Sequence, residues 1–178
     1  MKALIVIDAQ NDFCHHNGVL TSAAAEAAVP EIAKLVSRFH KKGYPIYYTQ
    51  DTHNYDYLKT QEGKNLPTLH CLYGSWGWRI HDEINIPGSS SRYPVYHLNK
   101  AAFGYDDWES EHLDQYSEIV VCGFVSSICV ISNILIIKSL YPELPITFVA
   151  NASAGLSPEN HAAAIEVLKS NQVKIQNL

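Results

Sequence analysis

The sequence predicts an α/β fold in which a parallel sheet is covered by helices on both faces. Short runs of apolar, β-branched residues alternate along the chain with longer segments whose apolar residues recur at helical spacing. This alternating order favours a parallel sheet over consecutive hairpins. The chain has 178 residues, of which 47% are hydrophobic and 17% charged, so it can bury a core and is not expected to be disordered. We therefore predict one domain over residues 1–178.

The predicted strands are short and mostly apolar. Residues 3–7 are apolar throughout, which is typical of a strand buried on both faces. This strand ends at Asp8, and a polar loop is expected from there to Gly18. Five further runs are predicted to be strands: residues 44–49, 94–98, 118–122, 146–149 and 173–175.

Three helices are predicted between these strands. Ser22 is placed to cap a helix that runs to about residue 42 and is ended by Gly43. A long apolar helix is predicted over residues 127–140, and a third over residues 158–169 with Pro158 in its first turn.

The stretch from residue 50 to residue 93 contains no predicted element. Long loops in compact domains are usually functional. In open α/β sheets the ligand crevice lies beyond the carboxyl ends of the strands, and Asp8, Asp51 and Gly123 fall at such ends. The sequence therefore places a candidate site at this edge of the sheet.

Charge and composition exclude several classes of partner. The net charge of −5 does not favour nucleic acid or an anionic membrane surface. No apolar run reaches the length of a membrane span, and the N-terminal run is too short for a signal sequence. The four cysteines form no CxxC pair, which indicates a reduced, cytoplasmic setting.

Cys129 is the candidate nucleophile because it begins a predicted helix directly after the turn at residues 123–127. The partial positive charge of a helix N-terminus favours a thiolate, so a depressed thiol pKa and rapid labelling by a thiol reagent are expected. The same N–H groups can hold an oxyanion. The alternative is a small buried core residue, which is how we interpret Cys122.

An aspartate and a lysine are candidate partners of this thiol. Asp8 is placed to take the thiol proton, although it can also be a turn residue, and Asp12 competes with it because spacing does not separate the two. Lys100 would hold the charge of the carboxylate and lower the thiol pKa. The alternative is an exposed lysine, which the apolar residues after it make less favourable.

Asp51 and His53 form a candidate metal site. Residues two apart in an extended chain point the same way, so these two side chains can grip one ion. Glu62 and His70, in the following loop, can add ligands. Oxygen and nitrogen donors with open positions suit Zn, Mn or Fe.

Five segments of the chain resemble the isochorismatase-like cysteine hydrolases and, within them, the nicotinamidases. They occur in the family's order and span nearly the whole chain. The segments are IDAQNDF at residues 7–13, DTH at 51–53, PTLHC at 67–71, KAAF at 100–103 and GFVSSICV at 123–130. The resemblance implies a three-layer α/β/α, Rossmann-like fold with a mostly parallel central sheet. It also implies that Cys129 is the nucleophile, Asp8 the general base and Lys100 the third member.

The resemblance further implies how a substrate is held. It implies a cis peptide between Phe124 and Val125, which would aim the amides of Val125 and Cys129 at an oxyanion. Phe13 would form an aromatic wall, and Ser126 completes the predicted substrate-binding residues. The implied metal ligands are Asp51, His53 and His70, with Glu62 as the fourth, and the implied cofactor is a divalent ion, Zn first and Mn or Fe as alternatives.

The expected function is a metal-assisted cysteine amidase that hydrolyses nicotinamide or a similar small ring amide through a thioester. A small-molecule amide is the expected partner, and a homo-oligomer is left open. Nicotinamidases usually carry an aromatic residue before the second metal histidine, where this chain has residues 66–69, LPTL. The alternatives are a related hydrolase of another small amide or a vinyl ether, and a non-catalytic metal- or ligand-binding module.

Overall fold

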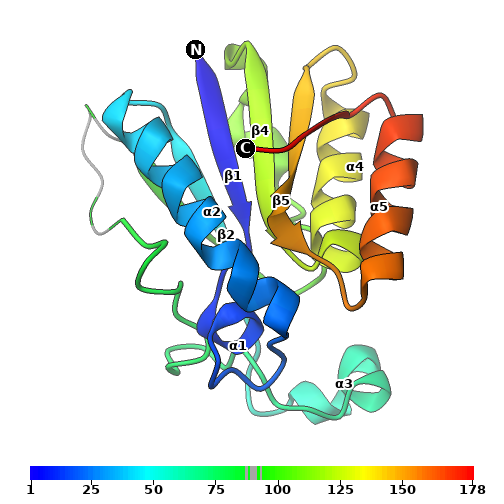
Figure 1. The fold of residues 1–178 in the computed structure, drawn as a ribbon. Coiled ribbons are helices and arrows are strands. Elements are labelled where there is room, and N and C mark those ends of the chain that lie inside the picture. Colours follow the sequence, from blue (N-terminus) through cyan, green and yellow to red (C-terminus); the bar gives the residue numbers. More distant parts are fainter. Residues whose placement is uncertain (87, 89–91, 93) are drawn as a thin grey trace.

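A parallel sheet forms the centre of the protein, as the computed structural model of residues 1–86, 88, 92 and 94–178 shows. Within these residues the strand order is β3-β2-β1-β4-β5-β6, and every pairing is parallel. The strands are β1 (Lys2–Ile7), β2 (Ile46–Asp51), β3 (Val95–Lys100), β4 (Glu118–Phe124), β5 (Ile146–Ala154) and β6 (Lys174–Gln176). Because all these pairings are parallel, the carboxyl ends of the strands share one edge of the sheet, toward which the arrows of β1, β4 and β5 point in Figure 1.

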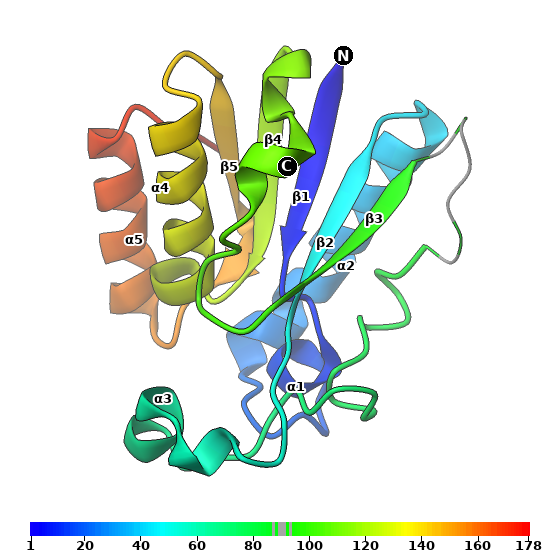
Figure 2. The same ribbon diagram turned by 180° about the vertical axis from the view of Figure 1, so that it is seen from behind.

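Helices cover both faces of the sheet, so the predicted three-layer α/β/α fold is confirmed. The helix α2 (Ala23–Lys41) crosses one face, whereas α4 (Ile131–Leu140) and α5 (Pro158–Ser170) lie on the other (Figures 1 and 2). Alternate residues of β1 are buried on opposite faces of the sheet, which explains why that strand is apolar throughout. Leu4 and Val6 pack in the core beneath α2, while Ile5 and Ile7 pack in the core beneath α4.

The ends of the elements account for most differences from the sequence prediction. The strands β2 and β3 run two residues further than predicted, to Asp51 and Lys100, because these polar residues still pair with each other in the ladder. The strand β5 extends to Ala154 through small residues that continue the pairing with β4. The helix predicted over 127–140 begins as a π-helical turn, Ser126–Val130, and becomes α4 only at Ile131.

The predicted loops contain short helices that periodicity does not detect. The polar stretch after Asp8 forms α1 (Asn11–Cys14). The stretch from 50 to 93 contains a 3₁₀ turn, η1 (Tyr57–Lys59), and α3 (Gln61–Asn65). Two more 3₁₀ turns, η2 (Trp108–Glu111) and η3 (Leu113–Gln115), follow β3. Each has five residues or fewer, too short to show a helical repeat.

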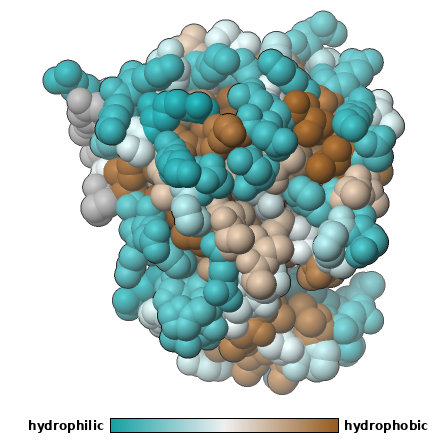
Figure 3. Space-filling model, viewed as in Figure 1, coloured by the Kyte–Doolittle hydropathy of each residue, from teal (hydrophilic) through white to brown (hydrophobic). Residues whose placement is uncertain are grey.

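The surface over α2 is mostly hydrophilic, with scattered apolar patches (Figure 3). Among the described residues, no helix has both the length and the apolar character that crossing a membrane would require. Such scattered patches are ordinary for a folded protein.

Gly123 is required where β4 passes β1 on its way to the candidate site. Its φ is +115°, and a Cβ there would collide with the carbonyl oxygen of Ile7. We expect Gly123→Ala to lower the free energy of unfolding by at least about 3 kcal/mol, measured by urea denaturation. Gly74→Ala is the matched control, since Gly74 has φ of +76° with no atom near its Cβ position and should lose only about 1 kcal/mol. Equal losses would show that the contact with β1 does not matter.

Candidate active site

The carboxyl ends of neighbouring strands bring the candidate residues together. Asp8 directly follows β1, while Asp51 and Lys100 are the last residues of β2 and β3 and stand opposite each other in the ladder. Cys129 lies in the turn that follows β4. All four side chains are buried, so their charges interact with little solvent screening.

Lys100 contacts both other members of the predicted catalytic group. Its Nζ lies 2.7 Å from Asp8 Oδ2 and donates to Cys129 Sγ at 3.7 Å. It also donates to the carbonyl of Ala102 at 3.0 Å, and its side chain is 1% exposed. Lys100 is therefore not the exposed surface lysine that was the alternative. The other oxygen of Asp8 accepts a hydrogen bond from Thr49 Oγ1 at 2.6 Å.

Asp12, which spacing did not separate from Asp8, has a different set of partners. Its Oδ2 accepts a hydrogen bond from the backbone N–H of Cys71 at 2.7 Å. A side chain at Gly77 would collide with its carboxylate, so this glycine allows the loop to close over it. Asp12 therefore connects the segment after β1 with the loop that contains Cys71, whereas Asp8 forms an ion pair with Lys100.

Burial raises the pKa of the Cys129 thiol well above its ordinary value, and the negative charge of Asp8 adds to this effect. Lys100 offsets them only in part. The expectation of a depressed thiol pKa was therefore wrong, because a sequence does not show how deeply a helix start is buried. Burial also raises the pKa of Asp8 despite the nearby lysine, which makes this carboxylate a stronger base than an exposed one. Rapid labelling of the resting thiol is no longer expected.

The candidate metal ligands gather beside this group. Ligand atoms of Asp51, His53, Glu62 and His70 all lie within 4.8 Å of one another. Asp51 Oδ2 is 2.9 Å from His53 Nε2 and 3.3 Å from His70 Nε2, and Glu62 Oε1 is 3.7 Å from His53 Nε2. Two imidazoles and two carboxylates form a donor set that suits Zn, Mn or Fe.

The tautomer of His70 fits this role. Its Nδ1 lies 2.8 Å from the carbonyl oxygen of Thr68. A carbonyl only accepts, so Nδ1 carries a proton, and Nε2 is the ring nitrogen that faces Asp51 and the other ligands. The second carboxylate oxygen of Asp51 is 3.5 Å from Lys100 Nζ, which joins the metal ligands to the catalytic group.

Several supporting residues are not detectable in the sequence. Gln10 forms two hydrogen bonds with the backbone of Asp51. Its Nε2 donates to the Asp51 carbonyl at 2.9 Å, and its Oε1 accepts from the Asp51 N–H at 2.8 Å. Tyr57 is buried against the rings of His53 and His70 and donates to Glu62 Oε1 at 3.4 Å. The Gln10 contacts join segments far apart in the sequence, whereas Tyr57 belongs to the same loop as Glu62 and meets it through the local fold of that loop.

The turn that carries Cys129 is anchored from two directions. The carboxamide of Asn133 donates to the Cys129 carbonyl at 2.7 Å and to the Phe103 carbonyl at 3.1 Å, which connects the turn to the segment after Lys100. Ser126 Oγ and His161 Nδ1 are hydrogen-bonded at 2.9 Å, which connects the turn to α5. The peptide between Phe124 and Val125 is cis, as the resemblance implied.

The ring of Phe13 lies 5.6 Å from that of His70 in an edge-on arrangement. Phe13, Phe124 and Val125 are among the residues that line a cavity of about 120 Å³. None of the candidate catalytic residues or metal ligands lines this cavity, although Val125 directly precedes the turn that carries Cys129.

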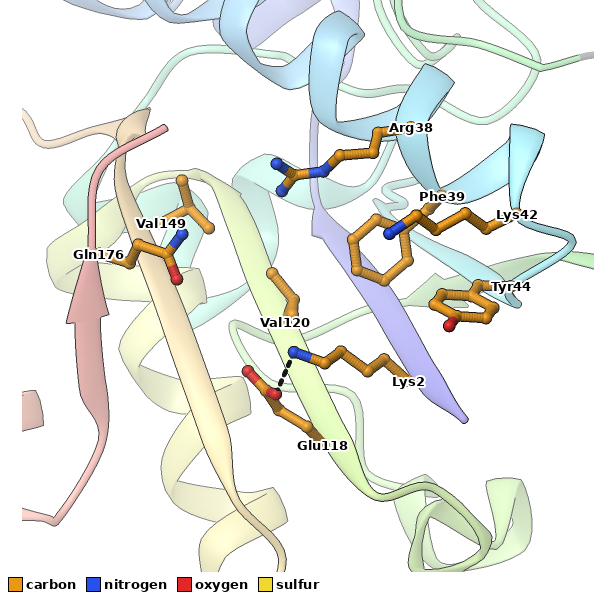
Figure 4. A pocket seen from close by; sticks show the side chains of 9 residues that line it. All are labelled: Lys2, Arg38, Phe39, Lys42, Tyr44, Glu118, Val120, Val149 and Gln176. Carbon is orange, nitrogen blue, oxygen red and sulfur yellow. Dashed lines mark ion pairs between the residues drawn. The ribbon is translucent and has the colours of Figure 1, made fainter.

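A second hollow, of about 280 Å³, lies at the opposite end of the strands (Figure 4). Its lining includes an ion pair between Lys2 and Glu118, and the side chains of Arg38 and Lys42 border it. It contains none of the candidate catalytic or metal-binding residues, so it is not part of the candidate active site.

A family model of the isochorismatase domain matches residues 2–177. The chain belongs to the isochorismatase family of hydrolases. An uncharacterised isochorismatase family protein of Bacillus subtilis is 30% identical over 128 residues, which cover 72% of this chain and 64% of that protein. A nicotinamidase of Schizosaccharomyces pombe is 25% identical, with 97% of this chain and 91% of that protein covered.

Solved structures share the fold over its whole length. The crystal structure of a nicotinamidase/pyrazinamidase from Bacillus subtilis is 25% identical, with a TM-score of 0.85 and 99% of both chains covered. A pyrazinamidase of Pyrococcus horikoshii in complex with zinc is 22% identical, with a TM-score of 0.83 and 99% of both chains covered. At this identity the second likeness concerns the fold alone.

Proposed function

We propose that this isochorismatase-family hydrolase is a metal-assisted cysteine amidase that converts nicotinamide or a similar small ring amide to the acid and ammonia. One observation carries the proposal: the Lys100 ammonium lies 2.7 Å from the Asp8 carboxylate, 3.7 Å from the Cys129 sulfur and 3.5 Å from the Asp51 carboxylate. A thiol, a base and a group of metal ligands are thus joined through one buried cation. The nicotinamidase relatives support the substrate class.

Asp8 and Cys129 would exchange one proton through the reaction. Because the thiol pKa is raised, the resting thiol keeps its proton, and Asp8 removes it as the sulfur attacks the amide carbon. The backbone N–H groups of Val125 and Cys129 would hold the oxyanion. Asp8 then gives the proton to the leaving nitrogen, which departs as ammonia and leaves a thioester. Water, activated by the same carboxylate, releases the acid and restores the thiol.

Lys100 remains positively charged throughout. Burial alone would lower the pKa of this amine, but the Asp8 carboxylate and the Cys129 sulfur raise it above its ordinary value. The ammonium would therefore stabilise the negative charge as it moves from carboxylate to sulfur.

Asp51, His53, Glu62 and His70 would hold the metal ion, Zn first and Mn or Fe as alternatives. When bound, the ion would supply a Lewis acid able to withdraw electron density from a nitrogen-containing ring. Phe13, which packs on His70, would hold the flat ring beside it.

Product analysis tests the proposal. Purified protein incubated with nicotinamide should release ammonia and nicotinate in equal amounts, measured by an ammonia assay and by chromatography. Parallel reactions contain a non-pyridine amide and the vinyl ether isochorismate. Turnover of one of these with none of nicotinamide would favour the related hydrolase, and no turnover of any would favour a binding module.

Removal of one metal ligand should be visible without an activity assay. We expect His70→Ala to weaken zinc binding at least about 100-fold, because a direct ligand matters more than the outer partners whose loss costs 10–100-fold. Zinc titration followed by elemental analysis measures it. His16→Ala is the control, since His16 is exposed and outside the ligand group. The same affinity in both variants would contradict the assignment.

A further inference from the structure

The hollow at the amino ends of the strands has an excess of positive charge. The cationic side chains of Lys2, Arg38 and Lys42 line it together with one carboxylate, that of Glu118. Lys2 begins β1 and Asp8 follows its end, so a strand of six residues, about 20 Å long, separates this hollow from the active site. The chain as a whole has a net charge of −5, so the local excess does not follow from its composition.

The single carboxylate leaves two of these cations uncompensated. Glu118 Oε2 pairs with Lys2 Nζ at 2.5 Å, and its Oε1 accepts a hydrogen bond from Thr147 Oγ1 at 2.7 Å. Both of its oxygens are therefore engaged. Within the part of the chain that the structure describes, the side chains of Arg38 and Lys42 have neither a hydrogen bond nor an ion pair. Two positive charges are thus available to a ligand.

These two charges lie close enough to meet one ligand. Arg38 and Lys42 are four residues apart at the C-terminal end of α2, which places them on one face of the helix. Positive side chains in a last turn also stabilise the helix dipole, but that role requires only closeness to the helix end. In Figure 4 the Arg38 side chain instead extends from α2 toward Val149 on β5 and Gln176 on β6. The Lys42 ammonium lies 5.9 Å from the centre of the Tyr44 ring, which also lines the hollow.

The opposite side of the hollow offers an uncharged polar group. Figure 4 shows the carboxamide of Gln176 facing the hollow, and this side chain has no hydrogen-bond partner among the described residues. A carboxamide both donates and accepts, so it can bind hydroxyl groups. The volume of about 280 Å³ lies near the lower limit of small-ligand pockets, about 300 Å³. The hollow therefore suits a small, hydrophilic anion.

We propose that this hollow is a second ligand site, which binds a small phosphate monoester whose organic part carries hydroxyl groups. A phosphate monoester has nearly two negative charges on one group at neutral pH, which matches the charges of Arg38 and Lys42. The guanidinium can form two parallel hydrogen bonds with phosphate oxygens, and the ammonium adds a point charge. The hydroxyl groups would contact Gln176. The inference is independent of the proposed function, because binding is measured without turnover.

Isothermal titration calorimetry at low ionic strength tests the ligand class, with ribose 5-phosphate as the probe. We expect saturable 1:1 binding with a Kd of about 1 mM or below. Inorganic phosphate should bind about fivefold more weakly because it lacks the hydroxyl contacts. Succinate, a dianion whose charges lie on two separate groups, should bind at least about tenfold more weakly than the probe. Weaker binding of the probe, or equal binding of succinate or of phosphate, would overturn the proposal.

Two variants divide the ligand into its parts. Arg38→Gln should weaken the binding of ribose 5-phosphate and of inorganic phosphate at least about tenfold, because both lose a charge-assisted contact. Gln176→Leu should weaken ribose 5-phosphate alone, to about the affinity of inorganic phosphate. Lys34→Gln is the matched control, since Lys34 is a cation of α2 that pairs with Glu31 and does not line the hollow. If Arg38→Gln bound the probe as Lys34→Gln does, the site would be refuted.

Two further measurements separate this site from the active site and from a purely structural role. His70→Ala should bind ribose 5-phosphate as wild type does, because His70 lies outside the hollow. A loss of binding in that variant would place the phosphate at the metal ligands and contradict the proposal. Arg38→Gln should keep the Tm of the free protein within a few degrees of wild type, since Arg38 is exposed. A clear fall in Tm with unchanged affinity would mean that this arginine serves only the helix end.

Discussion

Cys129→Ala should lower the rate of ammonia release from nicotinamide by at least about 10⁴-fold, because the covalent route disappears with the sulfur. The effect should fall on kcat, since the walls that bind the ring remain. Cys129→Ser should be nearly as inactive, because an alcohol is a weaker nucleophile than a thiol and Asp8 is not an imidazole base. Single-turnover measurements with excess protein check both variants.

Cys122→Ala is the matched control for this result. Cys122 is equally buried, but it lies in β4 and belongs to a cluster of apolar core residues. This variant should lose some stability and keep most of its turnover per folded molecule. If it were as inactive as Cys129→Ala, or if Cys129→Ala kept full activity, the nucleophile would have to be sought elsewhere.

Lys100→Met should produce the largest loss of stability among the site variants. It leaves the carboxylates of Asp8 and Asp51 buried without their shared cation, and breaking a buried ion pair in this way typically costs about 3–5 kcal/mol. Urea unfolding with a chelator present measures it, so that no metal ion replaces the ammonium. Turnover should also be lost, because the charge that balances Asp8 and the sulfur is gone.

A surface lysine and a double variant serve as controls for this prediction. Lys169 pairs with Glu166 at 2.7 Å, but both side chains are more than half exposed, so Lys169→Met should leave the urea midpoint unchanged. Adding Asp8→Asn to Lys100→Met removes one unpaired charge and should restore part of the stability without restoring turnover. A double variant no more stable than Lys100→Met alone would show that Asp8 is not the partner that matters.

The central sheet and its order of elements could be predicted because each inner strand is buried on both faces, which leaves an unmistakable apolar run such as that of β1. The positions at which the strands end were harder to predict from the sequence. Asp51 and Lys100 belong to strands only because they pair with each other, which is a property of the assembled sheet.

The candidate site was predictable to the extent that its residues follow strands. Asp8, Asp51 and Lys100 could be placed at one edge by topology alone, since parallel strands share that edge. The thiol pKa could not be predicted, because its direction depends on burial. Nor could the hydrogen bond between Ser126 and His161, which joins distant segments, or that between Tyr57 and Glu62, which depends on how the loop after β2 folds.

Lys100 ends β3, and β3 is an edge strand of the sheet that the described residues form, where it pairs with β2. Outer strands detach before the interior does, through partial openings that cost less free energy than complete unfolding. Mild denaturant should therefore abolish turnover at concentrations at which the circular dichroism spectrum of the protein is still native. Amide hydrogens of β3 should exchange with deuterium sooner than those of β1. Activity would then be lost through opening of the edge strand, well before global unfolding.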